Sequence, residues 1–266
     1  MSGPRWILLA VPASAIAIVT SLVPFFDDAI YRRETADWSA QATGQDIANL
    51  VVYPLLAVLA VVAWRGSTRA MLVALGLLGY SAYMFAVYCL DVHWNRLFLG
   101  YVAVFGLSLW ALAGGLAAID MPRVAWLGRS APTRAAVTLL VGLAVVFAVL
   151  WLSIELPAAV RGRPPSELAD VGLPTNPVHV LDLAVFLPAM AFAGLMLRAR
   201  RPVGYVLAPV LLTGAAAIGV GIVALTGVSA HRGLDAAWPA AGAIAVLVAV
   251  ESAVLARLLL AVGRPV

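Results

Sequence analysis

The chain has 266 residues, of which 64% are hydrophobic and only 11% are charged, and its formal net charge is +4. A soluble domain has roughly 25% charged residues, so this composition is too poor in charge to coat a water-facing surface and excludes a soluble globular protein. All 17 basic residues are arginine and lie mostly in short segments between apolar blocks, which indicates membrane topology and excludes a nucleic-acid-binding surface.

The apolar blocks have lengths near the ~20 residues that an α-helix needs to cross a ~30 Å hydrocarbon core. Because lipid offers no partner to unpaired backbone groups, helices are expected here and strands are not. The sequence predicts an all-α integral membrane protein, a bundle of about eight transmembrane helices forming a single polytopic domain over residues 1–266. The predicted spans are 6–25, 47–64, 70–91, 96–119, 135–156, 178–197, 203–227 and 238–260.

The first predicted span has two interpretations. Arg5 followed by the apolar run 6–19, with small residues at Ala13, Ser14 and Ala15, has the pattern of a secretory signal peptide. We interpret it instead as a retained helix, because the later segment 135–156 mirrors it.

The distribution of arginine predicts the orientation of the chain. Eleven arginines fall on the side of the N-terminus and six on the opposite side, which predicts that both termini are cytoplasmic in the plasma (inner) membrane. Exclusive use of arginine also indicates a GC-rich bacterial genome. The N-terminal side holds Arg5, Arg65, Arg69, Arg123, Arg129, Arg134, Arg198, Arg200, Arg201, Arg257 and Arg264.

The two halves of the chain look alike when the first is shifted by 133 residues. The coinciding positions are mostly polar, charged or proline, the rare types in this chain, which favours a tandem 4+4 helix repeat over coincidence among similar apolar helices. The halves are 1–133 and 134–266, and an even number of spans gives both the same orientation, as in parallel-repeat transporters. The matches are Pro24 with Pro157, Asp46 with His179, Asn49 with Asp182, Tyr53 with Phe186 and Arg65 with Arg198.

Two equivalent spans carry polar stripes at their outer ends. The i, i+3, i+7 spacing places each stripe on one helical face, and facing stripes at a repeat interface are where such proteins build substrate sites. We therefore expect an outer-leaflet polar pocket, although Asp46 also fits a helix N-cap and the tyrosines of the third span fit simple packing. The candidate substrate-binding residues are Asp46, Asn49, Tyr53, Asp91, Glu155, His179 and Asp182.

Glu251 is the most isolated charged residue inside a predicted span. A carboxylate in the hydrocarbon is costly, and in a proton-coupled carrier it binds a proton reversibly. Glu251 is therefore the proton-coupling candidate, and a structural hydrogen bond to a neighbouring helix is the alternative.

A metal site is a weaker hypothesis. His93, His179 and His231 all lie at predicted outer ends, and three histidines with an open position suit a divalent metal such as zinc. No HExxH or HxxxH motif is present, and the single cysteine, Cys89, excludes an intrachain disulfide and a cysteine-based metal framework. No other cofactor is predicted.

Three functional classes remain open. The first is a secondary carrier or permease-like protein for a small polar or cationic solute, which at this size is expected to form a homodimer. The second is a non-catalytic membrane subunit or sensor within a membrane complex, and the third is a membrane-embedded enzyme acting on a lipid-linked substrate. The chain lacks GxxxxGK[ST], GxSxG and similar signatures, which weighs against common enzyme classes.

Overall fold

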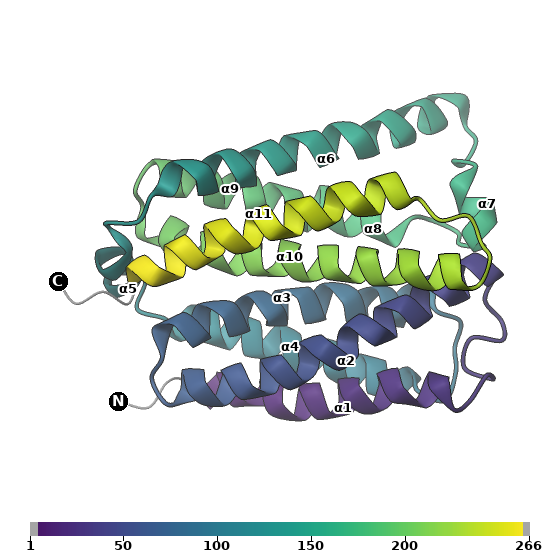
Figure 1. Cartoon of the computed structure of the whole chain (residues 1–266), viewed down its shortest axis with the longest axis horizontal. Coiled ribbons are helices and arrows are strands. Elements are labelled where there is room, and N and C mark those ends of the chain that lie inside the picture. Colours follow the sequence, from purple (N-terminus) through teal and green to yellow (C-terminus); the bar gives the residue numbers. More distant parts are fainter. Residues whose placement is uncertain (1–4, 263–266) are drawn as a thin grey trace.

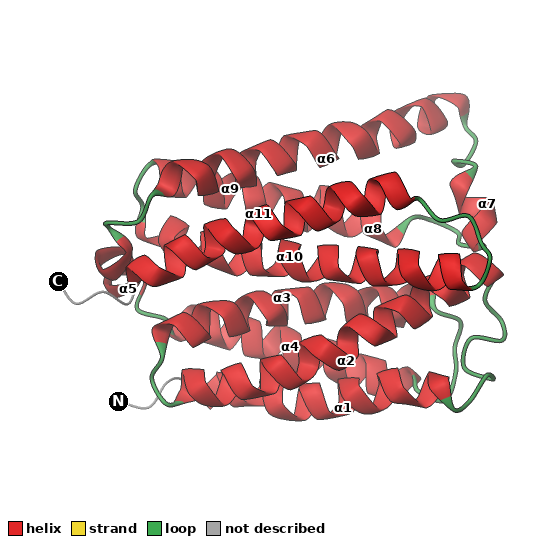
Figure 2. Ribbon diagram, in the orientation of Figure 1, coloured by secondary structure: helices red, strands yellow, loops and turns green. Residues whose placement is uncertain are grey.

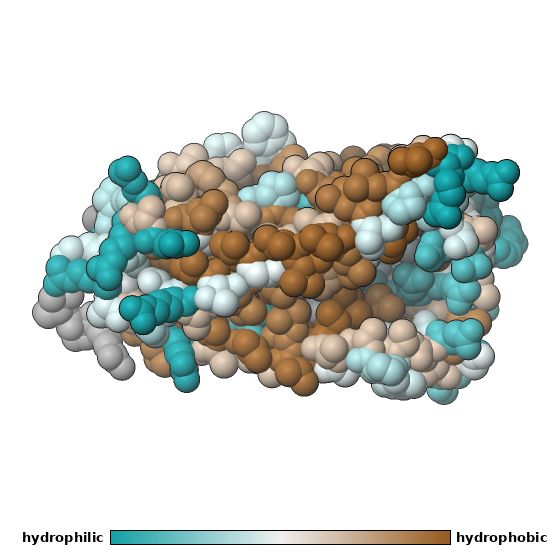
Figure 3. All heavy atoms as spheres, turned by 90° about the horizontal axis from the view of Figure 1, so that it is seen from above, coloured by the Kyte–Doolittle hydropathy of each residue, from teal (hydrophilic) through white to brown (hydrophobic). Residues whose placement is uncertain are grey.

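The computed structural model describes residues 5–262, and in this range the chain forms only helices and connecting loops (Figures 1 and 2). Eight helical segments are long and apolar enough to cross a membrane, which confirms the predicted number of spans. The space-filling view shows a broad hydrophobic band between two hydrophilic ends, as expected for a multi-pass membrane protein (Figure 3).

The eight spans are built from the following elements. The first comprises η1 (Arg5–Leu9), α1 (Ala10–Leu22) and η2 (Val23–Phe25), and it is followed by α2 (Ala36–Trp64), α3 (Thr68–Asp91) and α4 (Phe98–Ala118). The fifth is α6 (Thr133–Arg161), and the sixth comprises α8 (Pro177–Leu181), the π-helical turn η3 (Asp182–Phe186) and α9 (Leu187–Arg198). The last two are α10 (Pro202–His231) and α11 (Trp238–Val262).

Two short helices lie in the connections at opposite ends of the bundle, α5 (Met121–Gly128) and α7 (Glu167–Val171) (Figure 1). The first span begins and the last span ends at the same end as α5, which we call the α5 end. The opposite end is the α7 end.

Several helices are longer than the sequence predicts. The second span was expected to begin at residue 47, but α2 begins at Ala36, because the Thr35 hydroxyl accepts a hydrogen bond from the backbone N–H of Trp38 at 3.2 Å and caps the helix. The fifth span was expected to end near Pro157, which instead lies inside α6. These helices extend beyond the apolar segment, so hydropathy alone underestimates their length.

The first four spans close into a bundle, in which α1 and α3 each contact both α2 and α4. In the remaining half α6 packs on α9, α9 on α10 and α10 on α11, whereas α6 and α11 share few contacts. The long helix α10 joins the halves by packing against α2 and α3. Gly44 and Gly76 make this possible, because a Cβ atom at either would overlap Leu225 or Thr213 of α10.

The two arginine-rich hairpins at the α5 end turn through a residue with left-handed backbone conformation. This residue is Gly66 after α2, with φ of 103°, and Arg200 after α9, with φ of 54°. Glycine adopts such a conformation without steric cost, whereas arginine does not.

Candidate functional site

The sixth span begins at a capped turn that positions His179 and Asp182. The Asn176 side-chain oxygen accepts hydrogen bonds from the backbone N–H groups of Val178, at 3.0 Å, and His179, at 3.2 Å. These are donors that a helix start leaves unpaired. Pro177 occupies the first helical position, where its missing N–H has no consequence. The cap holds the helix so that His179 and Asp182 are both buried.

The span then widens into the π-helical turn η3. The backbone N–H of Leu187 bonds to the carbonyl of Asp182, five residues earlier rather than four. Pro188 follows at once; it has no N–H, and in a regular α-helix its ring would press on the carbonyl of Ala184. The wider turn leaves room for this ring, and it places Asp182 at the one irregular point of the span.

Asp182 joins three elements through its carboxylate. The hydroxyl of Tyr83, on α3, donates to Oδ1 at 3.0 Å, and the indole N–H of Trp151, on α6, donates to Oδ2 at 2.8 Å. Both donors are neutral, so the carboxylate is oriented and stabilised but has no positive partner in these contacts.

His179 and Glu155 form a pair next to this carboxylate. Nδ1 of His179 lies 2.7 Å from a carboxylate oxygen of Glu155. The imidazole also packs on the indole of Trp151, with ring centroids 4.3 Å apart. Trp151 therefore connects the two sites, because one edge bonds to Asp182 and one face covers His179.

Asp182 lines a partly open cavity of about 100 Å³ between α3, α6, the sixth span, α10 and α11, which we call the carboxylate pocket. Its second carboxylate is Glu251, midway along α11. Glu251 is only 2% exposed, and its side chain makes no hydrogen bond or ion pair with any residue in the range 5–262. The aromatic residues of the wall are Tyr83, Phe147, Trp151 and Phe186.

A second, wider pocket lies toward the α7 end and is lined by Glu155, Asn176 and His179 among others; it has a volume of about 710 Å³ and is open. The two pockets follow each other along one face of α6. Leu143, Phe147 and Trp151 line the carboxylate pocket, and residues from Glu155 to Gly162 line the wide pocket. The Trp151–His179 contact thus lies at the boundary between them.

The polar stripe of α2 lies elsewhere, in a network inside the first four spans. The hydroxyls of Tyr31 and Tyr88 donate to the two oxygens of Asp46 at 2.7 and 2.8 Å. Burial raises the pKa of the Tyr31 phenol well above its ordinary value, and the Asp46 carboxylate adds to this shift, so Tyr31 stays a donor.

Two further residues of α2, each about one helical turn beyond the previous one, extend this network. The Asn49 amide donates to the hydroxyl of Ser21 at 3.0 Å and accepts from Tyr80, and the Tyr53 hydroxyl donates to Ser81 at 3.0 Å. Asp46, Asn49 and Tyr53 are all fully buried. We call this set, with Tyr31 and Tyr88, the N-terminal polar network.

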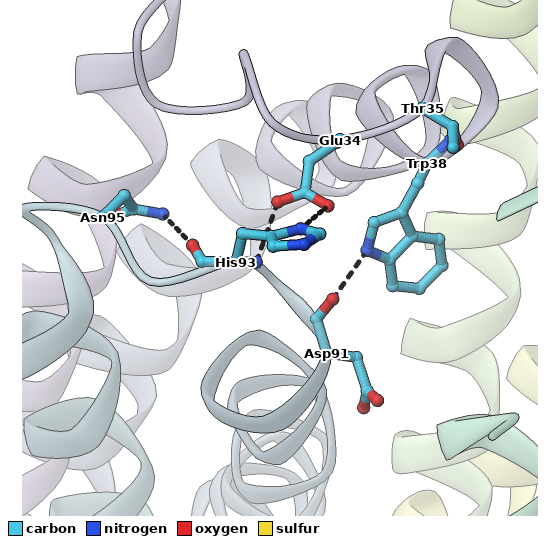
Figure 4. Close-up of polar contacts among 6 residues, drawn as sticks. All are labelled: Glu34, Thr35, Trp38, Asp91, His93 and Asn95. Atoms are coloured by element: carbon cyan, nitrogen blue, oxygen red, sulfur yellow. Dashed lines mark hydrogen bonds and ion pairs between the residues drawn. The ribbon is translucent and has the colours of Figure 1, made fainter. Parts of the chain in front are cut away.

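Asp91, the last residue of α3, and His93, in the loop that follows, lie at the edge of the α7 end (Figure 4). Both the backbone N–H and Nδ1 of His93 contact the Glu34 carboxylate, at 2.8 and 3.0 Å. The backbone carbonyl of Asp91 accepts from the indole of Trp38 at 3.1 Å, while its side chain points away from this cluster (Figure 4). These contacts tie the loop after α1 to the loop after α3.

The structure therefore separates the seven predicted substrate-binding residues into three places. Glu155, His179 and Asp182 are together, Asp46, Asn49 and Tyr53 belong to the N-terminal polar network, and Asp91 lies at the edge. The expectation that the stripes of the second and sixth spans face each other needs correction, because α3 lies between them. Tyr80 and Tyr88 of α3 bond to α2, whereas Tyr83 bonds to the sixth span.

Trp151 and Tyr31 were not singled out by sequence reasoning. Trp151 could have been identified from the sequence, since an indole N–H within a span needs a hydrogen-bond acceptor inside the protein. Tyr31 could not, because it lies in a loop and only the fold brings it to Asp46. The proximity of Glu251 to Asp182 likewise had no sequence signal.

The three histidines do not gather into a metal site. Within residues 5–262, no group of three or more His, Cys, Asp or Glu side chains is arranged to hold a metal ion. His93 and His179 each pair with a different glutamate, and His231 is exposed at the end of α10. Comparison with protein-family models, with curated proteins and with solved structures finds no match to this chain.

Proposed function

We propose that this protein is a secondary carrier for a small polar or cationic solute, which binds in the carboxylate pocket. One observation supports the proposal above all: the buried Asp182 and Glu251 line one cavity, and Glu251 has no partner among the described residues. A buried carboxylate without a partner is costly in lipid, and such residues mark ion and substrate pathways in membrane proteins.

In this mechanism the solute arrives through the wide pocket and passes the boundary formed by Trp151 and His179. Asp182 then binds it, held in position by Tyr83 and Trp151. The π-helical turn and Pro188 interrupt the regular hydrogen bonding of the sixth span at this level, which makes it the natural hinge. Movement at the hinge would break the Trp151–Asp182 bond and open the boundary.

Glu251 is the proposed proton site. Its uncharged form suits the apolar wall in the empty state, and its ionised form suits a pocket that holds a cation. A proton and a solute would then occupy the pocket in turn, which couples solute movement to a proton gradient. The N-terminal polar network has its hydrogen bonds satisfied internally, so we assign it to the scaffold rather than to the solute path.

For the orientation we propose cytoplasmic termini in a bacterial inner membrane, with the α7 end outside. The arginine excess at the α5 end supports this, since basic loops are retained in the cytoplasm. Acidic residues show the opposite distribution, with only Asp120 in the loops of the α5 end.

A tandem repeat is supported by matches at a shift of 133 residues, such as Asn49 with Asp182 and Arg65 with Arg198. Pro54 and the left-handed Gly66 match Pro188 and Arg200 one residue later, at a shift of 134.

A proton-flux assay in liposomes tests the carrier proposal. The purified protein is reconstituted, a panel of small amines, amino acids and sugars is added outside, and the internal pH is followed with a trapped dye. We expect solute-dependent proton flux in the parent and its loss in Glu251→Gln and Asp182→Asn. Glu167→Gln, on the exposed helix α7, is the matched control and should behave as the parent.

Equal flux in the parent and Glu251→Gln would remove the coupling mechanism. Stable co-purification with another membrane protein, together with unchanged function after Asp182→Asn, would favour the subunit or sensor hypothesis instead. A stoichiometric zinc that is lost when His93, His179 and His231 are replaced would favour the enzyme hypothesis.

A further inference from the structure

The carboxylate pocket has an excess of negative groups that its own walls do not balance. Its titratable residues are Asp182 from η3, Glu251 from α11 and Tyr83 from α3, and no described arginine or histidine lines it. His179, three residues before Asp182, acts on that carboxylate electrostatically from outside the pocket, but it is itself paired with Glu155. The residues contributed by α6 and α10 have no titratable side chain. Asp182 receives two neutral donors and Glu251 receives none. Two carboxylates in such a site require either a proton or a cationic ligand.

The walls favour a cation of a particular kind. Tyr83 and Phe186 pack edge to face with centroids 6.0 Å apart, and Phe147 and Trp151 lie 5.8 Å apart, so two aromatic pairs border the cavity. The faces of aromatic rings attract cations, and rings arranged around a site recognise alkylated ammonium groups. The rest of the wall is aliphatic, which suits methyl groups and offers no set of oxygen ligands for a hydrated metal ion.

The volume of the cavity sets the size of the ligand. Pockets for drug-sized molecules measure about 300–1,000 Å³, whereas this cavity measures about 100 Å³. The pocket itself therefore has room for an ammonium group with a few methyl substituents and cannot hold a whole drug-sized molecule.

The charge of the α7 end favours the approach of cations. The loops and helix ends on this side hold nine of the 13 acidic residues and six arginines, and a surplus of one sign raises the local concentration of the opposite ion. The acidic residues are Asp27, Asp28, Glu34, Asp37, Asp91, Glu155, Glu167, Asp170 and Asp235.

From these observations we infer that the carboxylate pocket binds a small alkylated ammonium ion. Asp182 is the fixed counter-ion, and Glu251 releases one proton when the cation enters, so that one positive charge replaces another. Binding follows from the pocket alone, whereas translocation of the ion rests on the carrier function proposed above.

Isothermal titration of the purified protein with tetramethylammonium chloride tests binding. We expect saturable binding that is weakened about tenfold or more in Asp182→Asn, Glu251→Gln and Trp151→Leu. Binding should be unchanged in the control Asp120→Asn, at the α5 end, where asparagine keeps the helix cap. The neutral molecule tert-butanol has a similar size and shape and should bind much more weakly. Titration in two buffers with different ionisation enthalpies should show about one proton released per ion, and this release should vanish in Glu251→Gln.

Three outcomes would overturn the inference: no binding by the parent, equal binding of the neutral molecule, or unchanged affinity in both carboxylate variants. Thermal unfolding of each variant in the same detergent separates loss of binding from loss of fold. Binding without solute-driven proton flux would contradict only the carrier proposal. Flux with a different solute, without tetramethylammonium binding, would contradict only the present inference.

Discussion

At the scale of single residues, two buried acids differ in their surroundings. Asp46 is fully buried and accepts two short hydrogen bonds from Tyr31 and Tyr88. Glu251 is buried almost as deeply and has no such partner among the described residues. A buried polar group with its hydrogen bonds made supports the fold, whereas one without them weakens it. The stability of the protein should therefore respond in opposite directions when the two are replaced.

We expect Asp46→Leu to destabilise the protein by about 3 kcal/mol. It leaves the buried hydroxyl of Tyr31 without an acceptor and that of Tyr88 with only a long bond, of 3.4 Å, to the carbonyl of Ala42. Glu251→Leu should instead be neutral or stabilise it by about 1 kcal/mol, since it removes an uncompensated buried acid. Thermal unfolding in detergent measures both. A melting temperature that falls equally in the two variants would show that Glu251 has a structural partner after all.

At the scale of helices, close contact between α10 and the first half depends on small residues. At Gly44 an added Cβ would overlap the backbone of Leu225, so the two helices lie nearly in backbone contact. At Gly227, also within a helix, nothing lies within 4 Å of the same position. Close helix packing therefore requires a glycine at position 44 but not at position 227.

Gly44→Ala should destabilise the protein by about 2 kcal/mol, because α2 and α10 must separate to admit the methyl group. Gly227→Ala is the matched control and should be neutral or slightly stabilising, since alanine favours a helix by up to about 1 kcal/mol over glycine. The comparison uses thermal unfolding under identical conditions. Equal effects of the two substitutions would argue against the tight contact.

The hairpin between α9 and α10 gives a second expectation at this scale. Arg200 has a left-handed backbone conformation that is costly for a residue with a Cβ atom. Arg200→Gly should therefore stabilise the protein by about 0.5–1 kcal/mol, partly offset by the greater freedom of glycine when unfolded. Arg198→Gly, in the last turn of α9, should do the reverse, and a lower melting temperature for Arg200→Gly would contradict the conformation assigned to this hairpin.

At the scale of the whole molecule, the arginine-rich α5 end and the acidic α7 end predict how the protein lies in the membrane. Single cysteines at the exposed positions Thr175 and Ala199, in a Cys89→Ala background, report on the two ends. In intact cells a membrane-impermeant maleimide should label Thr175→Cys at once and Ala199→Cys only after lysis. The opposite pattern would reverse the proposed orientation.

The number of spans and the need to bury the acids inside the protein were predictable from the sequence alone. A span is recognised from about 20 consecutive apolar residues, without knowledge of what it packs against. Only the tertiary structure decided which acids line the same pocket. Asp182 and Glu251 come from the sixth and eighth spans, and Asp46 is separated from Asp182 by α3. The physical reason is that the rotation and partners of each helix depend on distant contacts, such as Gly44 against Leu225, which no local pattern contains.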